Sequence, residues 1–189
     1  MRIRSILPLA ALLLAACGET PRAPSTPVQV PGGATTAEPA AAAPVAEGMP
    51  EFPKLVVTTF DGQRYDLADR KGRWVVGNFW ATWCKPCLKE IPDLAALDAG
   101  RDDIEVIGLA FEEIERPEME SFLEKRPIPY PIAVVDTFGP PSDFGIPRGL
   151  PMTFLISPEG RVAATHIGPV TSADLLADIA AAGGASGTR

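Results

Sequence analysis

WVVGNFWATWCKPC, residues 74–87, is the stretch that decides the fold of this chain. Its first seven residues are almost all apolar and predict a buried β-strand. Behind the strand, apolar residues recur at the spacing of one helix face, at Cys87, Ile91, Leu94 and Ala95. Cys84 is therefore expected at the N-terminus of a helix, with Cys87 one turn inside it.

Two cysteines at a helix N-terminus favour dithiol–disulfide chemistry. The first N–H groups of a helix have no partner within it and carry a partial positive charge, which favours a thiolate over a thiol. Such a position can lower a cysteine pKa from about 8.5 to roughly 3.5–7.5. We therefore expect Cys84 to be the attacking thiol and Cys87 the resolving thiol, close enough to form a disulfide.

The composition narrows the classes of function. The chain has 189 residues and a formal net charge of −7, and this length fits one domain of moderate size. An acidic chain without clustered Lys and Arg argues against a nucleic-acid partner, because neutralising phosphates requires such a cluster.

The N-terminus has the features of an export signal. Arg2 and Arg4 precede an apolar stretch at 6–16, which at about 1.5 Å per residue is too short to span a bilayer. Residues 1–16 are therefore predicted to be a signal peptide.

This signal ends in LAAC, residues 14–17, which resembles the lipobox of bacterial lipoproteins. In those proteins the cysteine is lipidated and becomes the mature N-terminus. The resemblance implies a lipid anchor on Cys17, and a location on the periplasmic side of the bacterial cell envelope. An ordinary signal peptide, cleaved near Ala16, is the alternative. The three cysteines of the chain then divide into one anchor and one redox pair.

Residues 17–50 are predicted to be a tether that begins at the lipidated cysteine. Prolines alternate there with alanine and other small residues, and no aromatic residue is present. Such a stretch cannot bury enough apolar surface to offset the entropy of ordering. An extended Pro-rich linker of this length reaches up to roughly 100 Å.

The folded domain is expected at 51–184, followed by a flexible tail at 185–189. Strands are predicted at 54–60, 63–67, 73–80, 104–110, 131–135, 152–156 and 161–167. Helices are predicted from the cysteine pair to residue 99, at 116–125, and at 172–182 with Thr171 or Ser172 as its N-cap. The first two strands form an N-terminal β-hairpin around Asp61-Gly62. This order predicts an α/β fold: a mixed central β-sheet with helices on both faces.

Three segments carry a resemblance to a known family. They are FWATWCKPC at 79–87, EIP at 90–92 and GLPMTFLI at 149–156. Over about residues 51–182 the chain resembles the TlpA/ResA type of membrane-tethered thiol–disulfide oxidoreductase, in the thioredoxin-like superfamily. The resemblance implies a thioredoxin-like fold and an enzyme that exchanges disulfides with protein substrates, without a cofactor or a metal.

The resemblance also assigns roles to residues around the cysteines. Pro151 matches the family's cis-proline, which packs opposite the disulfide and offers backbone to an extended substrate. Trp83, Pro86 and Leu150 are expected to belong to the same substrate-binding surface, with core packing as the alternative for Trp83. The loop at 144–150 contains an extra proline and about one more residue than expected from the family. Because this loop borders the substrate groove, the resemblance is a better guide to the chemistry than to substrate preference.

One acidic side chain is a candidate for proton transfer. Thioredoxins proper carry an aspartate in the strand before the motif, where this chain has Asn78. Glu90 is the substitute candidate, because it follows Cys87 by three residues and shares its helix face. A half-buried carboxyl there can exchange a proton with the resolving thiol. The alternative is a solvated surface glutamate. Lys85 is a candidate for stabilising the thiolate by its charge, although exposure screens that charge.

The Lys-Pro pair between the cysteines resembles reducing members of the family. We therefore expect a reductase of protein disulfides, such as apocytochrome c or copper-site cysteines, that works as a monomer. Its electrons are expected from a membrane thiol-electron transporter. The alternatives are a peroxiredoxin-like peroxidase and a copper-binding chaperone that uses His166 as a further ligand. A zinc site fits the sequence less well than these two alternatives, because no second pair of ligands is present.

Overall fold

The computed structural model describes residues 50–140 and 143–184. The predicted signal peptide, the lipidation site Cys17, the tether before residue 50 and the tail at 185–189 lie outside the described residues. They therefore stay predictions from the sequence.

The strand predicted from the opening stretch is the centre of a five-stranded sheet. All seven residues of β3 (Trp74–Trp80) are buried, which explains their nearly continuous apolar run. The sheet order is β5-β4-β3-β6-β7. β4 and β5 run parallel to β3, whereas β6 is antiparallel to β3 and to β7. The four outer strands are β4 (Ile104–Phe111), β5 (Ile132–Val135), β6 (Met152–Ile156) and β7 (Val162–Ile167).

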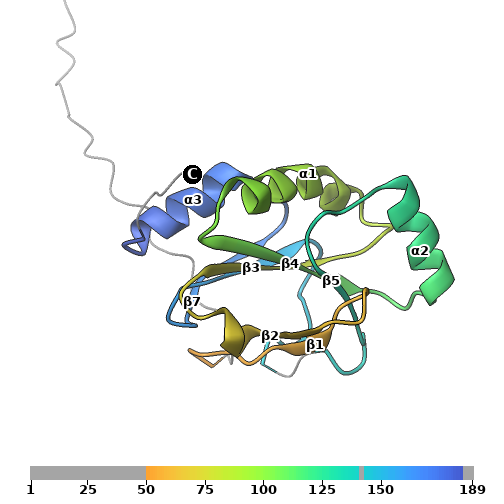
Figure 1. Cartoon of the computed structure of the whole chain (residues 1–189), viewed down its shortest axis with the longest axis horizontal. Helices are drawn as coiled ribbons and strands as arrows, with labels where there is room; N and C mark the ends of the chain where they lie inside the picture. Colours follow the sequence, from red (N-terminus) through yellow and green to blue (C-terminus); the bar gives the residue numbers. More distant parts are fainter. Residues whose placement is uncertain (1–49, 141–142, 185–189) are drawn as a thin grey trace, which may run out of the picture. The chain divides into compact units, whose positions relative to one another are not determined.

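The helices α1 (Lys85–Gly100), α2 (Arg116–Lys125) and α3 (Ser172–Ala181) complete the predicted α/β fold. The mixed sheet, the flanking helices and the N-terminal hairpin are confirmed. The placement of helices on both faces is wrong. The apolar side chains of all three helices belong to one cluster, on the face of β3 that carries Trp74, Val76 and Trp80. In Figure 1, α1 and α3 lie over the same side of the sheet.

The N-terminal hairpin and a loop cover the opposite face of the sheet. This second cluster takes Val75 and Phe79 from β3 and Leu55 and Tyr65 from the hairpin. Phe144, from the loop at 144–150, packs in the same cluster with its ring centroid 5.0 Å from that of Phe154. A short antiparallel ribbon thus replaces the second helical layer that the sequence pattern predicts (Figure 1).

The hairpin strands β1 (Val56–Thr58) and β2 (Arg64–Asp66) are shorter than predicted. Thr59 ends the first strand, because its hydroxyl bonds within the turn to Asp61 and to the Gln63 carbonyl. After Asp66 the chain enters a 3₁₀ turn, η1 (Leu67–Arg70), whose Ala68 N–H donates to the Asp66 carboxylate at 2.9 Å. Local side-chain bonds to the backbone therefore compete with the ladder at both ends.

The last helix begins as predicted. Thr171 is its N-cap and forms a capping box with Asp174, in which each side chain accepts from the other residue's backbone. Ser172 also ties α3 to α1, because its hydroxyl donates to the backbone carbonyl of Asp93 at 3.0 Å. This junction fixes the start of α3 beside the middle of α1.

Candidate active site

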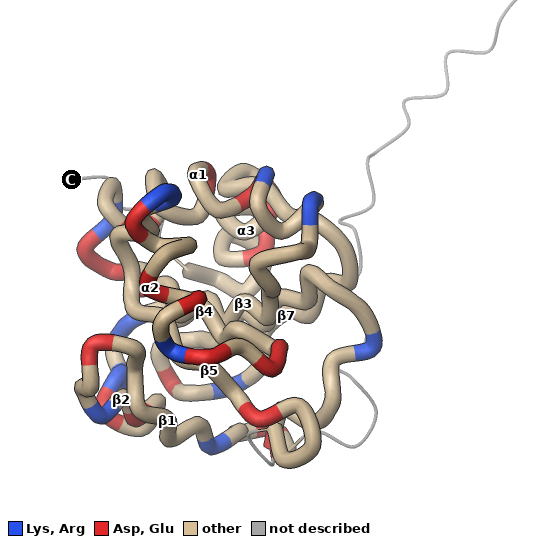
Figure 2. The backbone as a smooth tube through the Cα atoms, turned by 90° about the vertical axis from the view of Figure 1, so that its right-hand side faces the viewer, with Lys and Arg blue, Asp and Glu red and all other residues tan. Residues whose placement is uncertain are grey.

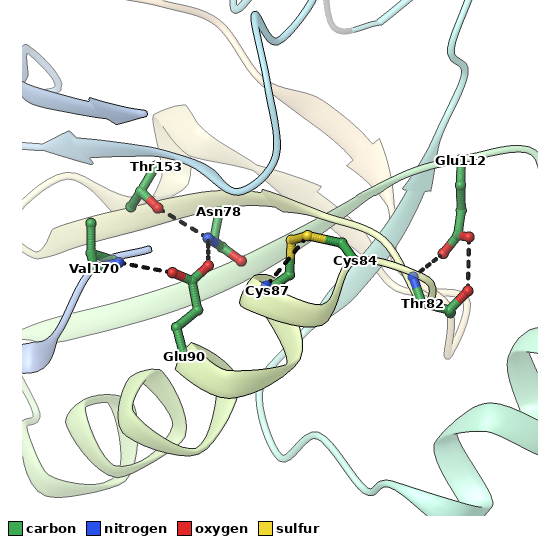
Figure 3. Close-up of a disulfide and its surroundings, with 8 residues drawn as sticks. All are labelled: Asn78, Thr82, Cys84, Cys87, Glu90, Glu112, Thr153 and Val170. Carbon is green, nitrogen blue, oxygen red and sulfur yellow. Dashed lines mark hydrogen bonds between the residues drawn. A yellow bond between two sulfur atoms is a disulfide. The ribbon is translucent and has the colours of Figure 1, made fainter. Parts of the chain in front are cut away.

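The cysteine pair forms a disulfide at the start of α1 (Figure 3). The Cys84–Cys87 S–S distance is 2.03 Å and the Cα atoms lie 5.3 Å apart. Cys84 is the N-cap of the helix, and Pro86 occupies its first turn, where a missing N–H costs little. The N–H of Cys87 donates to the Cys84 sulfur at 3.3 Å. The backbone of the first turn therefore points a donor at this sulfur, as the sequence predicts.

The two sulfurs differ in access. Cys84 is 4% exposed, whereas Cys87 is completely buried. Trp83, directly before the pair, is 67% exposed, which excludes the core-packing alternative for this side chain. An incoming molecule therefore meets Trp83 and the edge of Cys84 before it can reach Cys87.

Glu90 lies in the same helix as Cys87 and is only 4% exposed, so the surface alternative is wrong. One carboxylate oxygen accepts from the Asn78 side-chain amide at 2.8 Å and the other from the Val170 N–H at 2.9 Å. Burial raises the pKa of Glu90, and the hydrogen bonds from Val170 and Asn78 partly offset this effect. The carboxyl is more deeply buried than the half-buried position expected from the sequence.

Asn78 also belongs to the site. From the sequence it was noted only as the position where thioredoxins proper carry an aspartate. Its amide nitrogen donates to Glu90 and, at 3.0 Å, to the Thr153 hydroxyl of β6, as Figure 3 shows. The amide oxygen of Asn78 is buried and accepts no hydrogen bond from the residues that the structure describes. The available signal was a polar residue in the middle of a fully buried strand, because such a group requires a partner.

The peptide bond between Leu150 and Pro151 is cis, as the resemblance implies. The antiparallel register pairs Phe79 with Met152. Continuing this register by one residue places Pro151 beside Trp80, where β3 ends and the loop at 81–84 (the motif loop) begins. Pro151 is buried and Leu150 is half-buried. The structure thus brings the cis-proline to the end of the strand that leads to Cys84.

A second residue that the sequence reasoning missed is Glu112, which directly follows β4. Its carboxylate accepts from the Thr82 N–H at 2.7 Å and from the Thr82 hydroxyl at 2.8 Å (Figure 3). Glu112 is 8% exposed. The sequence offers only a weak signal for it, because an acidic run at the end of a strand usually faces solvent.

The copper and zinc alternatives find little support in the described part of the chain. His166 lies on β7, and its Nε2 is 2.6 Å from the Asp178 carboxylate of α3. Within residues 50–140 and 143–184, no group of three or more His, Cys, Asp or Glu side chains is placed to hold a metal ion. Over the same residues, every helix is too short or too polar to cross a membrane.

Comparison with known proteins agrees with this geometry. Residues 49–165 match the AhpC/TSA family, which is more than half of the chain. The chain belongs to the AhpC/TSA family. This AhpC/TSA protein is 30% identical over 134 residues to the thioredoxin-like protein YneN of Bacillus subtilis (strain 168), covering 69% of this chain and 77% of the relative. It is 34% identical over 127 residues to the thiol-disulfide oxidoreductase ResA of Bacillus anthracis, covering 66% and 72%.

Solved structures give the same result for the AhpC/TSA chain. A thiol:disulfide interchange protein of the thioredoxin family from Chlorobium tepidum TLS matches with a TM-score of 0.59 and 28% identity, over 71% of this chain and 96% of that one. StoA from Bacillus subtilis matches with a TM-score of 0.57 and 26% identity, over 67% and 96%. The resemblance to ResA-type proteins is confirmed, and the chain is a thiol–disulfide oxidoreductase with a disulfide between Cys84 and Cys87.

Proposed function

We propose that this enzyme is a reductase of protein disulfides that works outside the cytoplasmic membrane. The exchange chemistry rests on the disulfide in the first turn of α1, where Cys84 retains some exposed surface and Cys87 has none. Cys84 is therefore the sulfur that substrates reach, and Cys87 is the sulfur that resolves the intermediate. The reducing direction rests on the Lys85-Pro86 pair between the cysteines.

The exchange proceeds in two steps. In the reduced enzyme, the Cys84 thiolate attacks one sulfur of a substrate disulfide and expels the other as a thiolate. The Cys87 thiolate then attacks Cys84, releases the second substrate thiolate and closes the Cys84–Cys87 disulfide. Two electrons pass from the enzyme dithiol to the substrate, and the two enzyme thiol protons end on the substrate thiols. A membrane thiol-electron transporter restores the dithiol by the same exchange in reverse.

Glu90 is proposed to accept and return the proton of the Cys87 thiol. The carboxyl lies one turn after Cys87 in α1 and is shielded from water. Its raised pKa supports this role, because a carboxyl transfers a proton to a thiol more readily as their pKa values approach each other. Asn78 and Val170 hold the carboxylate in place for this transfer.

The substrate-binding surface is proposed to consist of Trp83, Pro86, Leu150 and Pro151. Trp83 and Pro86 are exposed beside the disulfide. Pro151 lies beside the end of β3, where an extended substrate can run along the backbone that precedes β6. The loop that precedes Pro151 is anchored at its start by the buried ring of Phe144.

The cellular setting is inferred from the N-terminal sequence. A lipid on Cys17 and the tether after it would hold the catalytic domain near a membrane on the periplasmic side. There the substrates would be cysteine pairs such as those of apocytochrome c or copper sites, which would give the enzyme a part in cytochrome c biogenesis. Lys and Arg are scattered over the described domain and interleaved with Asp and Glu (Figure 2), which fits a protein substrate better than nucleic acid. We propose that the enzyme acts as a monomer.

A trapping experiment tests the exchange mechanism. Cys87→Ser leaves Cys84 without its resolving partner, so mixed disulfides with periplasmic proteins should accumulate and disappear on addition of dithiothreitol. Cys84→Ser is the matched control and should trap none. Equal trapping by both variants, or by neither, would contradict the assigned roles of the two cysteines.

The direction of electron flow has its own test. The midpoint potential of the Cys84–Cys87 couple, measured against glutathione or dithiothreitol, should lie well below that of strong periplasmic oxidants, about −120 mV. A value near −120 mV would leave the exchange chemistry intact but overturn the assignment as a reductase.

A further inference from the structure

We propose that Glu112 is a positioning residue for Cys84: it holds the loop from Ala81 to Cys84 in place and adds a fixed negative charge beside it. The proposal rests on the exchange chemistry of the cysteine pair and does not depend on the direction of electron flow. It assigns a second carboxylate, besides Glu90, to the control of the disulfide.

The sheet places Glu112 beside the motif loop. β3 and β4 are parallel, and their register pairs Trp80 with Ala110, so both strands end at the same edge. Two residues beyond each of these positions stand Thr82 and Glu112. The Glu112 carboxylate accepts from the Thr82 N–H at 2.7 Å and from the Thr82 hydroxyl at 2.8 Å. A carboxylate that receives two hydrogen bonds in a nearly buried position forms a strong, directional link.

This link acts on a tight turn. The N–H of Cys84 donates to the Ala81 carbonyl at 3.1 Å, which closes the loop around Thr82 and Trp83. The Glu112 carboxylate therefore bonds to this turn from the end of the neighbouring strand β4 (Figure 3). Without Glu112, the turn keeps its own bond between the Cys84 N–H and the Ala81 carbonyl but loses both bonds from the end of β4. A displacement of about 1 Å at a reacting atom can cost on the order of 100-fold in rate.

The charge of Glu112 has a separate consequence. A negative charge near Cys84 disfavours the thiolate and so favours the disulfide over the dithiol. Other charged groups face the same region: Lys85 follows Cys84, Glu90 lies further along α1, and Glu113, Glu115, Glu118 and Asp136 line one hollow of about 510 Å³ with Glu112. Only Glu112 among these bonds to the motif loop in the described contacts, so its effect should differ from theirs.

Two substitutions separate position from charge. Glu112→Gln removes the charge but can keep both bonds, because its amide oxygen accepts the Thr82 N–H and its amide nitrogen donates to the hydroxyl. Glu112→Ala removes both bonds and the charge. Glu113→Gln is the matched control, because it removes a neighbouring charge whose contact is a single 3.5 Å bond from the Thr137 hydroxyl.

The assays use the whole protein. The first measures the rate at which reduced Cys84 attacks a disulfide reagent across a range of pH. The profile gives the apparent pKa of the Cys84 thiol and, at its high-pH plateau, the rate of attack by the fully ionised thiolate. The second measures the equilibrium in which enzyme disulfide and two glutathione thiols give enzyme dithiol and oxidised glutathione. A melting curve of each variant reports its folding.

Glu112→Ala is expected to slow the attack by the fully ionised Cys84 thiolate by at least about tenfold. Glu112→Gln is expected to keep the thiolate rate within about twofold, lower the apparent thiol pKa, and shift the glutathione equilibrium toward the dithiol by about three- to tenfold. A tenfold shift equals about 30 mV. Glu113→Gln should change neither quantity.

Two results would overturn the proposal. The first is a Glu112→Ala variant whose fully ionised Cys84 thiolate attacks the disulfide reagent as fast as the wild-type thiolate. The second is a Glu113→Gln variant that shifts the thiol pKa and the glutathione equilibrium as much as Glu112→Gln does. If Glu112→Ala does not fold, Thr82→Val is used in its place. Thr82→Val removes one of the two bonds to Glu112 and should slow the attack by the Cys84 thiolate by a smaller factor. A midpoint potential typical of an oxidant would overturn the reductase assignment but leave these differences between variants untouched.

Discussion

Asn78→Asp places a second carboxyl beside Glu90 in the core and tests whether that site is truly buried. In the native protein, the Asn78 amide nitrogen lies 2.8 Å from one Glu90 oxygen and 3.0 Å from the Thr153 hydroxyl. The substitution exchanges this donor for an acceptor that is negatively charged at neutral pH. Two carboxylates then face each other at a position from which water is excluded.

The expected loss of stability follows from the distance and the burial. Two like charges that move apart from the native 2.8 Å contact to about 4 Å still repel by about 4 kcal/mol at an effective dielectric constant of about 20. Losing the hydrogen bonds of Asn78 costs a further 1–3 kcal/mol, roughly, because Glu90 keeps a buried acceptor without its donor. Asn78→Ala shares the second cost but not the first, so it is the matched control.

The pH dependence gives the sign of the effect. Burial already raises the folded-state pKa of Glu90, and a second carboxylate raises it further. The protonated form is then stabilised in the folded state, so stability is highest below the unfolded-state pKa of about 4 and falls as pH rises through the folded-state pKa. The gap in stability between Asn78→Asp and Asn78→Ala should therefore widen from about pH 5 to about pH 8.

Urea unfolding of the oxidised protein, followed by tryptophan fluorescence at several pH values, measures this gap. A gap of about 4 kcal/mol at the high end that shrinks on acidification would support the buried carboxyl pair. A gap that is small and constant with pH would show that water reaches Glu90, and the reasoning for its role as a proton carrier would fail.

Two further pairs of variants test the packing that supports the site. Gly108→Ala should lower the unfolding free energy by about 1–3 kcal/mol, because a Cβ there would lie 3.0 Å from Nε1 of Trp80, whereas Gly77→Ala, with nothing within 4 Å, should cost far less in the same urea titration. Phe144→Ala should cost about 3–5 kcal/mol, because its ring is buried, while Phe138→Ala removes a ring that is 87% exposed and should barely change the melting temperature. Equal effects within either pair would contradict the packing described for these two clusters.

The sequence determined the local structure and the chemistry of this protein. Strand β3, helix α1 with Cys84 at its N-cap, and the Thr171 cap of α3 depend on residues within a few positions of one another. Hydrophobic periodicity and capping residues act over that short range, so the pattern predicts these elements and places the cysteine pair at a helix N-terminus. The covering of the sheet was less predictable, because a helix and a short ribbon can bury the same apolar face.

Only the tertiary structure decided the surroundings of the disulfide. Glu90 meets Asn78 across 12 residues and Val170 across 80, while Glu112 reaches Thr82 across 30. These contacts depend on which strands become neighbours and in what register, which no local pattern encodes. The reactive sulfur therefore follows from its own stretch of chain, but the carboxylates beside it are positioned by the order of the strands in the sheet.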